Sequence, residues 1–319
     1  MTQKLLCVGH TTLDTFIEIE HPDLHCDVNN KNCEVCFEFG KKLPVSKVHY
    51  GIGGGAANVA VGTSNLGLQT YIYSIIGKGH KGSDVEDSFK NHQVNCDYLL
   101  KDDNPTDQAT IISYTVDRTV FTYNHKRHYT LKDVKDTFQE IFISSIGDDV
   151  SEIYKELADL KEKITELRIF YNPGSRELKN QSNLVSELLT SVDYFISNVE
   201  EACMALNSGL KRDQIDVEDL TELLIEKGVK NVVMTDGVNG SYVANESSFN
   251  HVPAELTKVV EKTGAGDAYA AGFIASTLYG NDLVTSAKWG TLNSAAVIKE
   301  VGAQEGLLSL DKMNSLIKS

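Results

Sequence analysis

From about residue 141 onward, short apolar runs alternate with amphipathic segments of helical length. The apolar runs predict strands and the longer segments predict helices. The strands are expected at 141–145, 167–171, 193–197, 231–235 and 240–244, and the helices near 151–163, 181–190, 199–206 and 217–227. Strands joined by helices run parallel in one sheet. The alternation therefore predicts an α/β fold with a mostly parallel sheet between helices, whose ligands bind beyond the C-terminal ends of the strands.

A second, smaller group of strands is predicted in the N-terminal part of the chain. Residues 109–116 and 119–123 are rich in β-branched and aromatic residues and predict a hairpin. With 12–19 and 45–50, this hairpin is expected to form a small sheet apart from the main one, while the polar stretch 21–42 leaves the core. The rest of the main fold is expected to comprise strands at 4–8, 69–76 and 94–100 and helices at 56–66, 83–91, 265–279, 283–300 and 310–318.

The composition limits the partners of the chain. Its 319 residues carry a net charge of −15, which argues against nucleic acid or an anionic membrane as a main partner. No apolar run approaches the ~20 residues of a membrane span, and the N-terminus enters strand-like sequence without the apolar core of a signal peptide. We therefore expect a cytoplasmic protein that forms a single domain over residues 1–319.

Three of the six cysteines, Cys26, Cys33 and Cys36, lie close together in the polar stretch. A Cys-x-x-Cys with a third Cys and a nearby His has the ligand types of a tetrahedral zinc site. The chain has no second Cys-x-x-Cys and no regular ligand spacing, so zinc binding stays an open question. Free thiols in a reducing cytosol are the favoured interpretation.

The segment with the clearest chemical use is Gly264-Ala265-Gly266-Asp267, which opens an Ala-rich run with helical spacing. The free backbone N–H groups at a helix N-terminus form an anion site. A carboxylate in the first turn beside that site can take a proton from a hydroxyl while the N–H groups stabilise charge on a phosphoryl group. A Gly-rich turn with Asp267 as an ordinary helix-start residue is the alternative.

A second Gly-rich turn, Gly53-Gly54-Gly55, opens the predicted helix that carries Asn58. Asn58 offers a donor and an acceptor, which suits a diol, and Asp14 follows the first strand closely. Asn58 could instead be an ordinary Asn on a helix surface, and Asp14 could instead be a turn residue. The turn does not follow the first strand, and the next strand ends without an acid for a ribose, so we reject a Rossmann dehydrogenase.

Two further turns follow predicted strands of the main sheet. Asn198 and Glu201 share a helix face and could hold the water shell of Mg²⁺, although the same spacing also forms a helix capping box. Thr235-Asp-Gly237, followed by Gly240, marks a strand end where a nucleotide could lie, or a simple hairpin turn.

Taken in order, these motifs resemble those of the ribokinase-like (PfkB-type) carbohydrate kinase family over nearly the whole chain. The resemblance rests on Asp14, Gly53-Gly-Gly-x-x-Asn58, Gly67, Gly77, Asn198-x-x-Glu201, Thr235-x-Gly237, Gly264-Ala-Gly-Asp267, Asn293 and Gly302-Ala-Gln. It implies a three-layer α/β/α core with a small β-sheet lid formed by about 12–19, 45–50 and 109–130. It also implies ATP- and Mg²⁺-dependent transfer of a phosphoryl group to an alcohol.

The same resemblance implies roles for individual residues. Asp267 would be the general base, and the N–H groups of Gly264, Ala265 and Gly266 would form the anion hole. The remaining implied contacts are Asp14, Gly54, Gly55 and Asn58 to the acceptor, Thr235, Gly237, Gly240 and Asn293 to the nucleotide, and Asn198 and Glu201 to Mg²⁺. Such positioning and charge stabilisation are what phosphoryl transfer requires.

The chain also departs from the family pattern. Many relatives carry Asp-Thr where Glu261-Lys262 stands here, which leaves a monovalent-cation site beside the anion hole open. Gly55 replaces a Lys typical of ribokinase itself, so a strict ribose kinase is not implied. We expect a kinase of a small sugar or polyol, with a nucleoside kinase, a sugar-phosphate kinase and a non-catalytic sensor as alternatives. A homodimer through the lid also stays open.

The basic run His125-Lys126-Arg127-His128 bears on the sugar-phosphate alternative. It is expected in the lid region, where it could bind a phosphate on the substrate. A short basic run is more often part of a solvated loop. Both interpretations stay open at this point.

Overall fold

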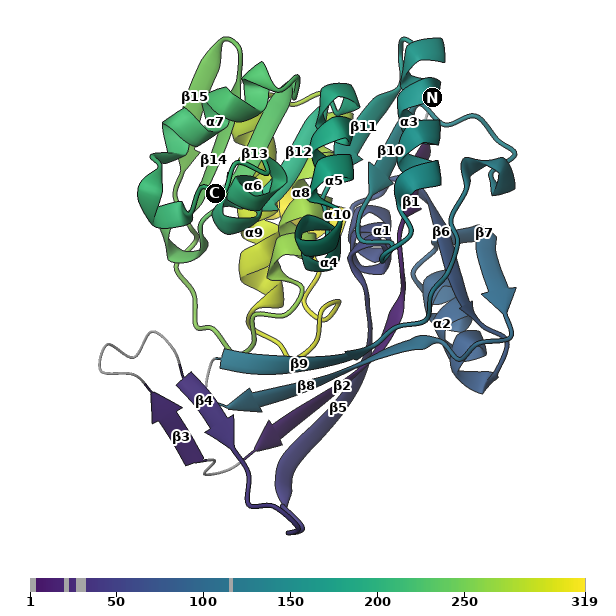
Figure 1. The fold of residues 1–319 in the computed structure, drawn as a ribbon, viewed down its shortest axis with the longest axis vertical. Helices are drawn as coiled ribbons and strands as arrows, with labels where there is room; N and C mark the ends of the chain where they lie inside the picture. The colour runs from purple at the N-terminus through teal and green to yellow at the C-terminus, as the bar shows by residue number, and fades with distance from the viewer. Residues whose placement is uncertain (1–3, 20–22, 27–32, 115–116, 319) are drawn as a thin grey trace.

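The computed structural model describes residues 4–19, 23–26, 33–114 and 117–318. It contains one large sheet covered by helices and one small sheet that stands apart from it (Figure 1). The large sheet consists of β1 (Lys4–Val8), β6 (Gln69–Gly77), β7 (Asn95–Asp102), β10 (Glu140–Ile143), β11 (Arg168–Tyr171), β12 (Tyr194–Asn198), β13 (Asn231–Thr235), β14 (Ser241–Asn245) and β15 (Ser248–Val252). Its strand order is β15-β14-β13-β12-β11-β10-β1-β6-β7.

All strand pairs from β13 to β7 are parallel, whereas the β13–β14 and β14–β15 pairs are antiparallel, so β14 alone runs against the other strands of this sheet. The helices are α1 (Gly55–Asn65), α2 (His80–Asn91), α3 (Ser151–Lys163), α4 (Ser175–Asn180), α5 (Ser182–Leu188), α6 (Val199–Ala205), α7 (Val217–Glu226), α8 (Ala265–Leu278), α9 (Leu283–Val297) and α10 (Leu310–Ile317). The predicted α/β fold with a mostly parallel sheet is therefore confirmed.

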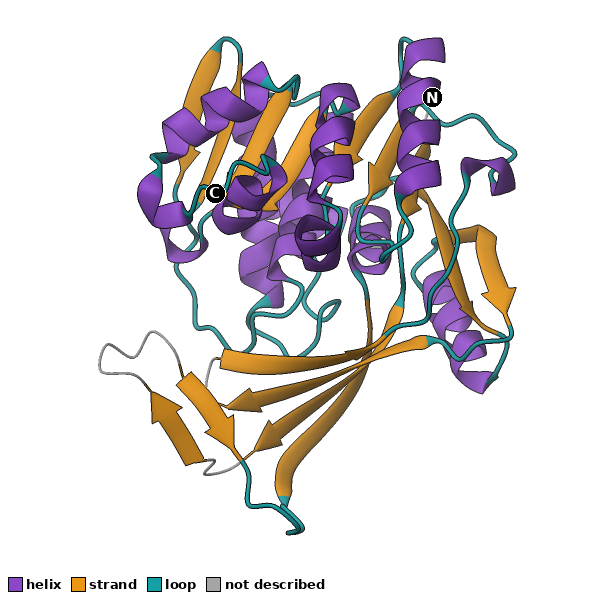
Figure 2. Cartoon of the chain, in the orientation of Figure 1, coloured by secondary structure: helices purple, strands orange, loops and turns teal. Residues whose placement is uncertain are grey.

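Side-chain alternation along β1 explains why helices cover both faces of the large sheet. Leu5 and Cys7 pack with the core beneath α1 and α8, whereas Leu6 and Val8 pack with the core beneath α3 and α7. All four side chains are fully buried. A strand whose successive side chains are all apolar must be covered on both faces, which gives the three-layer α/β/α arrangement visible in Figure 2.

The small sheet comprises β2 (Thr12–Ile19), β5 (Val45–Gly53), β8 (Asp107–Tyr114) and β9 (Asp117–Tyr123), in the order β5-β2-β8-β9. It uses all the segments predicted for it, although the predicted hairpin residues 115–116 lie outside the described residues. Phe16, Ala109 and Ile111 form the buried inner face and pack against Val301 from the C-terminal part of the chain. The small sheet therefore faces the segment that follows α9.

Several short elements differ from the sequence predictions. The helix predicted at 83–91 begins at His80, and α4 and β15 were not predicted. The polar stretch 21–42 contains an antiparallel hairpin of β3 (Asp23–Cys26) and β4 (Cys33–Cys36), while residues 20–22 and 27–32 lie outside the described part. No helix within the described part of the chain is long and apolar enough to span a membrane.

Candidate active site

The side chains of Asn58 and Asp267 meet at the start of two helices. Asn58 lies in the first turn of α1, is 3% exposed, and its Nδ2 donates a 2.7 Å hydrogen bond to Oδ2 of Asp267. Asp267 lies in the first turn of α8. Burial raises the pKa of its carboxyl group, while the hydrogen bond from Asn58 and the nearby His10 oppose this rise. Asp267 is thus a partly buried carboxyl held in a fixed orientation.

Small residues bring these helices close together. A Cβ atom on Gly62 of α1 would lie 2.6 Å from the Cβ of Ala271 in α8. A Cβ atom on Gly272 of α8 would lie 2.6 Å from the backbone oxygen of Trp289 in α9. Such distances leave no room for any side chain. The Ala-rich sequence of α8 therefore lets α1 and α9 approach closely enough for Asn58 to reach Asp267.

The segment between α9 and α10 closes one side of this pair. Gln304 Nε2 donates to Oδ1 of Asn58 at 3.1 Å, so the Asn58 amide is engaged at both ends. The backbone of Ala303 lies against Gly264, and the neighbouring Glu305 bonds His49 of the small sheet at 3.1 Å. Residues 302–304 match the family pattern in sequence, but no role is predicted for them from it. The structure places them in contact with the site and with the small sheet.

Asp14 is a second buried carboxyl group at this site. It lies on β2, is 6% exposed, and accepts a 2.6 Å hydrogen bond from the Thr12 hydroxyl. Burial raises the pKa of Asp14 to about 6, Thr12 and His10 lower it, and the charge of Asp267 raises it. Two carboxyl groups that influence each other's ionisation therefore lie near one another at the C-terminal end of the sheet.

The Gly-rich turn before α1 lies directly against these acids. A Cβ on Gly53 would lie 2.0 Å from the Asp14 carboxylate, and a Cβ on Gly55 would lie 3.4 Å from Oδ1 of Asp267. Gly54 has φ +97°, and a Cβ there would lie 2.3 Å from the backbone oxygen of His10. The left-handed backbone and the lack of space both require glycine at residue 54. The backbone of the turn therefore lines the site directly beside Asp14 and Asp267.

His10 is a site residue that the sequence analysis missed. Its Nδ1 bonds the backbone oxygen of Ser145 at 2.8 Å, and its charge lowers the pKa values of both Asp14 and Asp267. The Ser145–Gly147 segment is in turn held by the fully buried carboxylate of Glu177, which accepts hydrogen bonds from Ser145 Oγ and from the N–H groups of Ile146 and Gly147. A single His after a strand gives no sequence signal for such a position.

The N-terminus of α8 presents backbone donors. Gly264 has φ +79° and ends the preceding loop in the left-handed conformation. Ala265 N–H donates to the Lys262 oxygen at 3.2 Å, whereas the N–H groups of Gly266 and Asp267 have no acceptor among the described residues. Together with the helix dipole, these N–H groups form a site suited to an anion.

A cavity of about 150 Å³ begins at this helix N-terminus. Its lining includes Gly266 and the predicted nucleotide contacts Thr235, Gly237 and Gly240. Asn293, predicted from the resemblance to border the same ligand, does not line the cavity. It is fully buried, donates to the Ala268 oxygen at 2.7 Å and accepts from Leu308 N–H at 2.9 Å. Asn293 therefore joins α8, α9 and the segment before α10.

Asn198 and Glu201 form the capping box that the sequence allowed. Asn198 Oδ1 accepts from Glu201 N–H at 2.8 Å, and Glu201 Oε2 accepts from Asn198 N–H at 3.1 Å. Burial raises the pKa of Glu201, and the charge of Asp267 contributes to this rise. Glu201 is therefore close enough to the acid pair for their charges to interact. Its Oε1 has no hydrogen-bond partner within the described part of the chain.

Glu261, in the loop before α8, is engaged by protein donors. It is 6% exposed and accepts hydrogen bonds from Thr263 N–H at 2.9 Å and from the Thr263 hydroxyl at 2.8 Å. Arg118 of the small sheet lies 3.6 Å from the same carboxylate. The contact joins the small sheet to the loop that precedes α8.

The cysteine cluster does not form a metal site among the described residues. Cys26 forms a disulfide bond, so the expectation of free thiols is wrong for this residue. Cys36 is free and exposed, and the side chain of Cys33 lies outside the described part of the structure. The pairing of β3 with β4 brings the chain back on itself at Cys26, which makes a cross-link geometrically accessible there.

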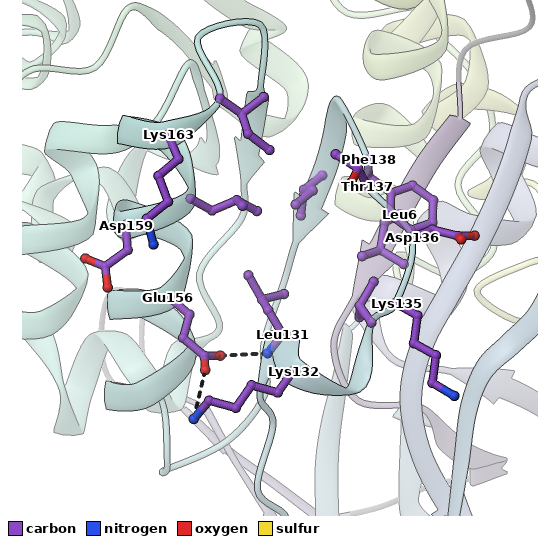
Figure 3. A pocket seen from close by; sticks show the side chains of 14 residues that line it. Leu6, Leu131, Lys132, Lys135, Asp136, Thr137, Phe138, Glu156, Asp159 and Lys163 are labelled. Carbon is purple, nitrogen blue, oxygen red and sulfur yellow. Dashed lines mark hydrogen bonds and ion pairs between the residues drawn. The ribbon is translucent and has the colours of Figure 1, made fainter.

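Another pocket, of about 360 Å³, lies apart from the acid pair between α3 and residues 131–138 (Figure 3). On one side of it, the carboxylate of Glu156 accepts a 2.6 Å hydrogen bond from the N–H of Leu131. None of the predicted site residues lines this pocket. The candidate active site is therefore the acid pair and the α8 N-terminus.

A fixed carboxylate beside exposed N–H groups at a helix N-terminus is an arrangement that suits phosphoryl transfer to a small molecule. The model of the pfkB family carbohydrate kinases matches residues 3–310, and the chain belongs to this family. A nucleoside kinase of Methanocaldococcus jannaschii is 26% identical over 98% of this chain and 95% of its own length. A ribokinase of Staphylococcus aureus is 24% identical over 99% of this chain and 100% of its own length.

The fold is also similar to that of solved structures. A ribokinase of Cryptococcus neoformans, crystallised in complex with ADP, has a TM-score of 0.76 at 18% identity over 99% of this chain and 100% of that chain. Kinases of this family use ATP, and their acceptors are small sugars or nucleosides. The chain is therefore a sugar or nucleoside kinase of the ribokinase type.

Proposed function

We propose that the protein transfers the γ-phosphoryl group of ATP to a hydroxyl group of a small sugar or polyol. The observation that carries this proposal is the 2.7 Å hydrogen bond from Asn58 to Asp267, beside the unpaired N–H groups at the start of α8. It aligns a base with an anion site, and phosphoryl transfer needs this positioning more than covalent help.

In the proposed reaction, Asp267 takes the proton from the acceptor hydroxyl. The hydroxyl oxygen forms a bond to the γ-phosphorus, the bond to the β–γ bridging oxygen breaks, and ADP leaves. Gly264, Ala265 and Gly266 form the turn that receives the transferred group, with Gly266 N–H free to donate and Ala265 N–H already engaged by Lys262. The helix end thus stabilises charge that develops on the phosphoryl oxygens.

The acceptor is proposed to lie between Asp14 and the Gly53–Gly55 turn. The carboxylate of Asp14 would accept hydrogen bonds from hydroxyl groups, and the Gly54 and Gly55 backbone permits close approach. Asn58 is proposed to act chiefly through Asp267, because both ends of its amide are already engaged. This shifts Asn58 from an acceptor contact to a residue that orients the base.

The nucleotide is proposed to occupy the cavity of about 150 Å³ lined by Thr235, Gly237 and Gly240. Asn293 supports this region from the core through its bonds to α8. Glu201, with Asn198, is proposed to hold Mg²⁺ through its water shell, since oxygen donors suit this ion and Oε1 of Glu201 is available. When bound, Mg²⁺ neutralises charge on the phosphates of ATP.

Nucleoside phosphorylation is the second candidate. The similarity to the nucleoside kinase of Methanocaldococcus jannaschii favours it. The same base and anion site would serve either acceptor, so the two candidates differ only in the part of the acceptor that lies away from the reacting hydroxyl.

The small sheet is proposed to act as a lid and to join two copies of the chain. Its outer face exposes Val48 and Tyr50 on one edge strand and Phe121 and Tyr123 on the other, and Tyr50 is 75% exposed. Several exposed apolar side chains on one face are typical of an interface. Another copy of the same sheet would offer a matching apolar face.

The test is ADP release from Mg·ATP across sugars, polyols, nucleosides and sugar phosphates. Turnover on sugars or polyols supports the proposal, and turnover on nucleosides alone supports the second candidate. An absence of turnover on every class, with ATP still bound, would contradict both.

A further inference from the structure

A second cavity, of about 140 Å³, lies beside the acid pair. Its lining includes His10 and Ser145, whose hydrogen bond was described above. His10 lowers the pKa values of both carboxyl groups at the site, and the neighbouring Ser144 lies against the Gly55 turn. Through His10 and the Ser144–Ser145 segment, the cavity is connected to the proposed acceptor position.

The carboxylates that line this cavity have cationic partners, but one of its cations has no carboxylate partner among the described residues. Its two carboxylates each have an arginine partner: Asp107 bonds Arg127, and Asp148 bonds Arg176. Lys126 also lines the cavity, is exposed, and forms no ion pair with any described residue. In a chain with a net charge of −15, a lysine without a carboxylate partner beside the active site is available to a ligand anion.

The residues of the basic run His125-Lys126-Arg127-His128 differ in their contacts. Arg127 is 6% exposed and is held by Asp102, Asp107 and the Pro105 oxygen, so it supports the fold. His125 bonds Asp107 as well. Of the four residues of the run, Lys126 is the one that lines the cavity and has no carboxylate partner among the described residues.

The cavity also contains a polar atom without a partner. Asn124 lines it, and the buried Oδ1 of Asn124 has no hydrogen-bond partner among the described residues. A buried acceptor left without a partner costs about 1–3 kcal/mol, so such atoms usually meet a ligand or water. A hydroxyl group of a bound acceptor would satisfy this atom.

The lining does not suit a heteroaromatic base. Among the described residues that line it there is no Phe, Tyr or Trp, Ile146 is the one aliphatic side chain, and the two imidazole rings, of His10 and His125, are hydrogen-bonded to Ser145 and Asp107. Nucleobases are usually bound by stacking on aromatic rings or by apolar walls. The polar and charged lining suits hydroxyl groups and anions instead.

We propose that this cavity binds an oxyanion, either a carboxylate or a phosphate, carried by the acceptor at the end away from the reacting hydroxyl, with Lys126 as its counter-ion. The proposal rests on the proposed function, because it takes the acceptor to lie beside Asp267. It narrows the acceptor from small sugars in general to those with an acidic group. Lys126 is then a specificity residue and not a catalytic one.

The experiment compares a hexose, its 6-phosphate and the aldonate of the same carbon skeleton as acceptors for Mg·ATP. Lys126→Ala and Lys126→Glu are measured beside Lys155→Glu, a charge reversal at an exposed position of α3. We expect an anionic acceptor to have the highest kcat/KM, and Lys126→Glu to raise its KM at least ~10-fold, since a charge-assisted contact is worth about 1.5–3 kcal/mol. The neutral hexose should be unaffected, and Lys155→Glu should change each constant less than about twofold.

The two anionic arms identify the source of the charge, because one acceptor carries a phosphate and the other carries a carboxylate. A preference for the neutral hexose, or Lys126 variants with unchanged constants for every acceptor, would overturn the inference while leaving the proposed function intact. If no acceptor turns over, calorimetric titration of the 6-phosphate and the aldonate decides it. If the wild type binds one of these anions and Lys126→Glu abolishes that binding, the inference is supported but the proposed function is not. If the wild type binds neither anion, the inference is overturned.

Discussion

Asn58 and Asp267 lie 209 positions apart in the sequence, yet the amide of one holds the carboxylate of the other at 2.7 Å. Gln304 holds the opposite end of the same amide at 3.1 Å. The proposed base is therefore fixed by a chain of hydrogen bonds that spans α1, α8 and the segment before α10. Such a chain orients the carboxylate before any substrate binds.

Replacing the base should separate chemistry from binding. Asp267→Asn keeps the shape of the side chain but removes the proton acceptor, so kcat should fall at least ~10²-fold while ATP affinity changes little. The control is Asp282→Asn, which alters the N-cap of α9 and retains its capping bond to Thr285. Steady-state kinetics and nucleotide titration check both variants, and near-wild-type kcat in Asp267→Asn would exclude the role.

Removing the Asn58 amide should act through Asp267. The hydrogen bond from Asn58 lowers the pKa of Asp267, so its loss in Asn58→Ala raises that pKa. The base must be ionised, so the acidic limb of the kcat profile should move to higher pH and kcat should fall about tenfold or more. Gln304→Ala, which removes an amide that bonds Asn58 and not Asp267, should shift the limb less. An effect of Asn58→Ala on KM alone would indicate direct acceptor contact.

Asp14 should destabilise the folded protein at neutral pH. Burial raises its pKa from 3.8 to about 6, so the folded state binds this proton more tightly than the unfolded chain. Stability is therefore lost as the pH rises from 3.8 to about 6, by up to roughly 3 kcal/mol at ~1.4 kcal/mol per pKa unit.

Asp14→Asn removes this ionisation. Its unfolding free energy should exceed that of the wild type at pH 8, and the difference should shrink towards pH 4, while acceptor affinity falls. Asp97→Asn at an exposed position of β7 serves as the control. Urea titrations at the two pH values measure the difference, and an equal gain at both would contradict the assignment.

A methyl group on Gly53 should disturb the acceptor side of the site. Its Cβ would lie 2.0 Å from the Asp14 carboxylate, which must then move. Gly53→Ala should therefore raise the acceptor KM more than the ATP KM. Gly79→Ala is the matched control, because a Cβ at Gly79 meets nothing within 4 Å. Equal kinetics for the two variants would show that Asp14 is not an acceptor contact.

The exposed face of the small sheet should hold two chains together. Tyr50→Glu places a charge at a side chain that is 75% exposed in the single chain. We expect the wild type to sediment with the mass of two chains and the variant with the mass of one. Leu223→Glu, on the exposed side of α7, should leave the mass unchanged. A wild-type protein with the mass of one chain would refute the dimer.

The sequence predicted most of the fold because burial on both faces of β1 and its neighbours leaves a continuous apolar run. The elements that were missed are short, such as α4 with six residues, or lie in the polar stretch, such as β3 and β4. In these segments, pairing partners and not periodicity decide the structure. The antiparallel β15 follows β14 after a tight turn and extends the sheet at its edge.

The candidate site was predicted in outline. Asp267 and its Gly-rich turn have a local signal, because the residues that matter are adjacent in the sequence. His10 has none, and Gln304 belongs to a family-like segment that had no predicted role, since both roles arise from contacts with residues more than a hundred positions away. Asn293 matched a motif by position, but the packing of α8 against α9 directs its amide into the core.

The hydrogen-bond chain from Asn58 to Asp267 and Gln304 also has a consequence for biosynthesis. At roughly 5–20 residues per second, about 10–40 s pass between the synthesis of Asn58 and that of Asp267. A nascent chain that has built β1, α1 and β6 still lacks its base, and one that stops before Gln304 lacks the brace for Asn58. Full activity is therefore expected only after the segments that carry Asp267 and Gln304 have been made and have folded against Asn58.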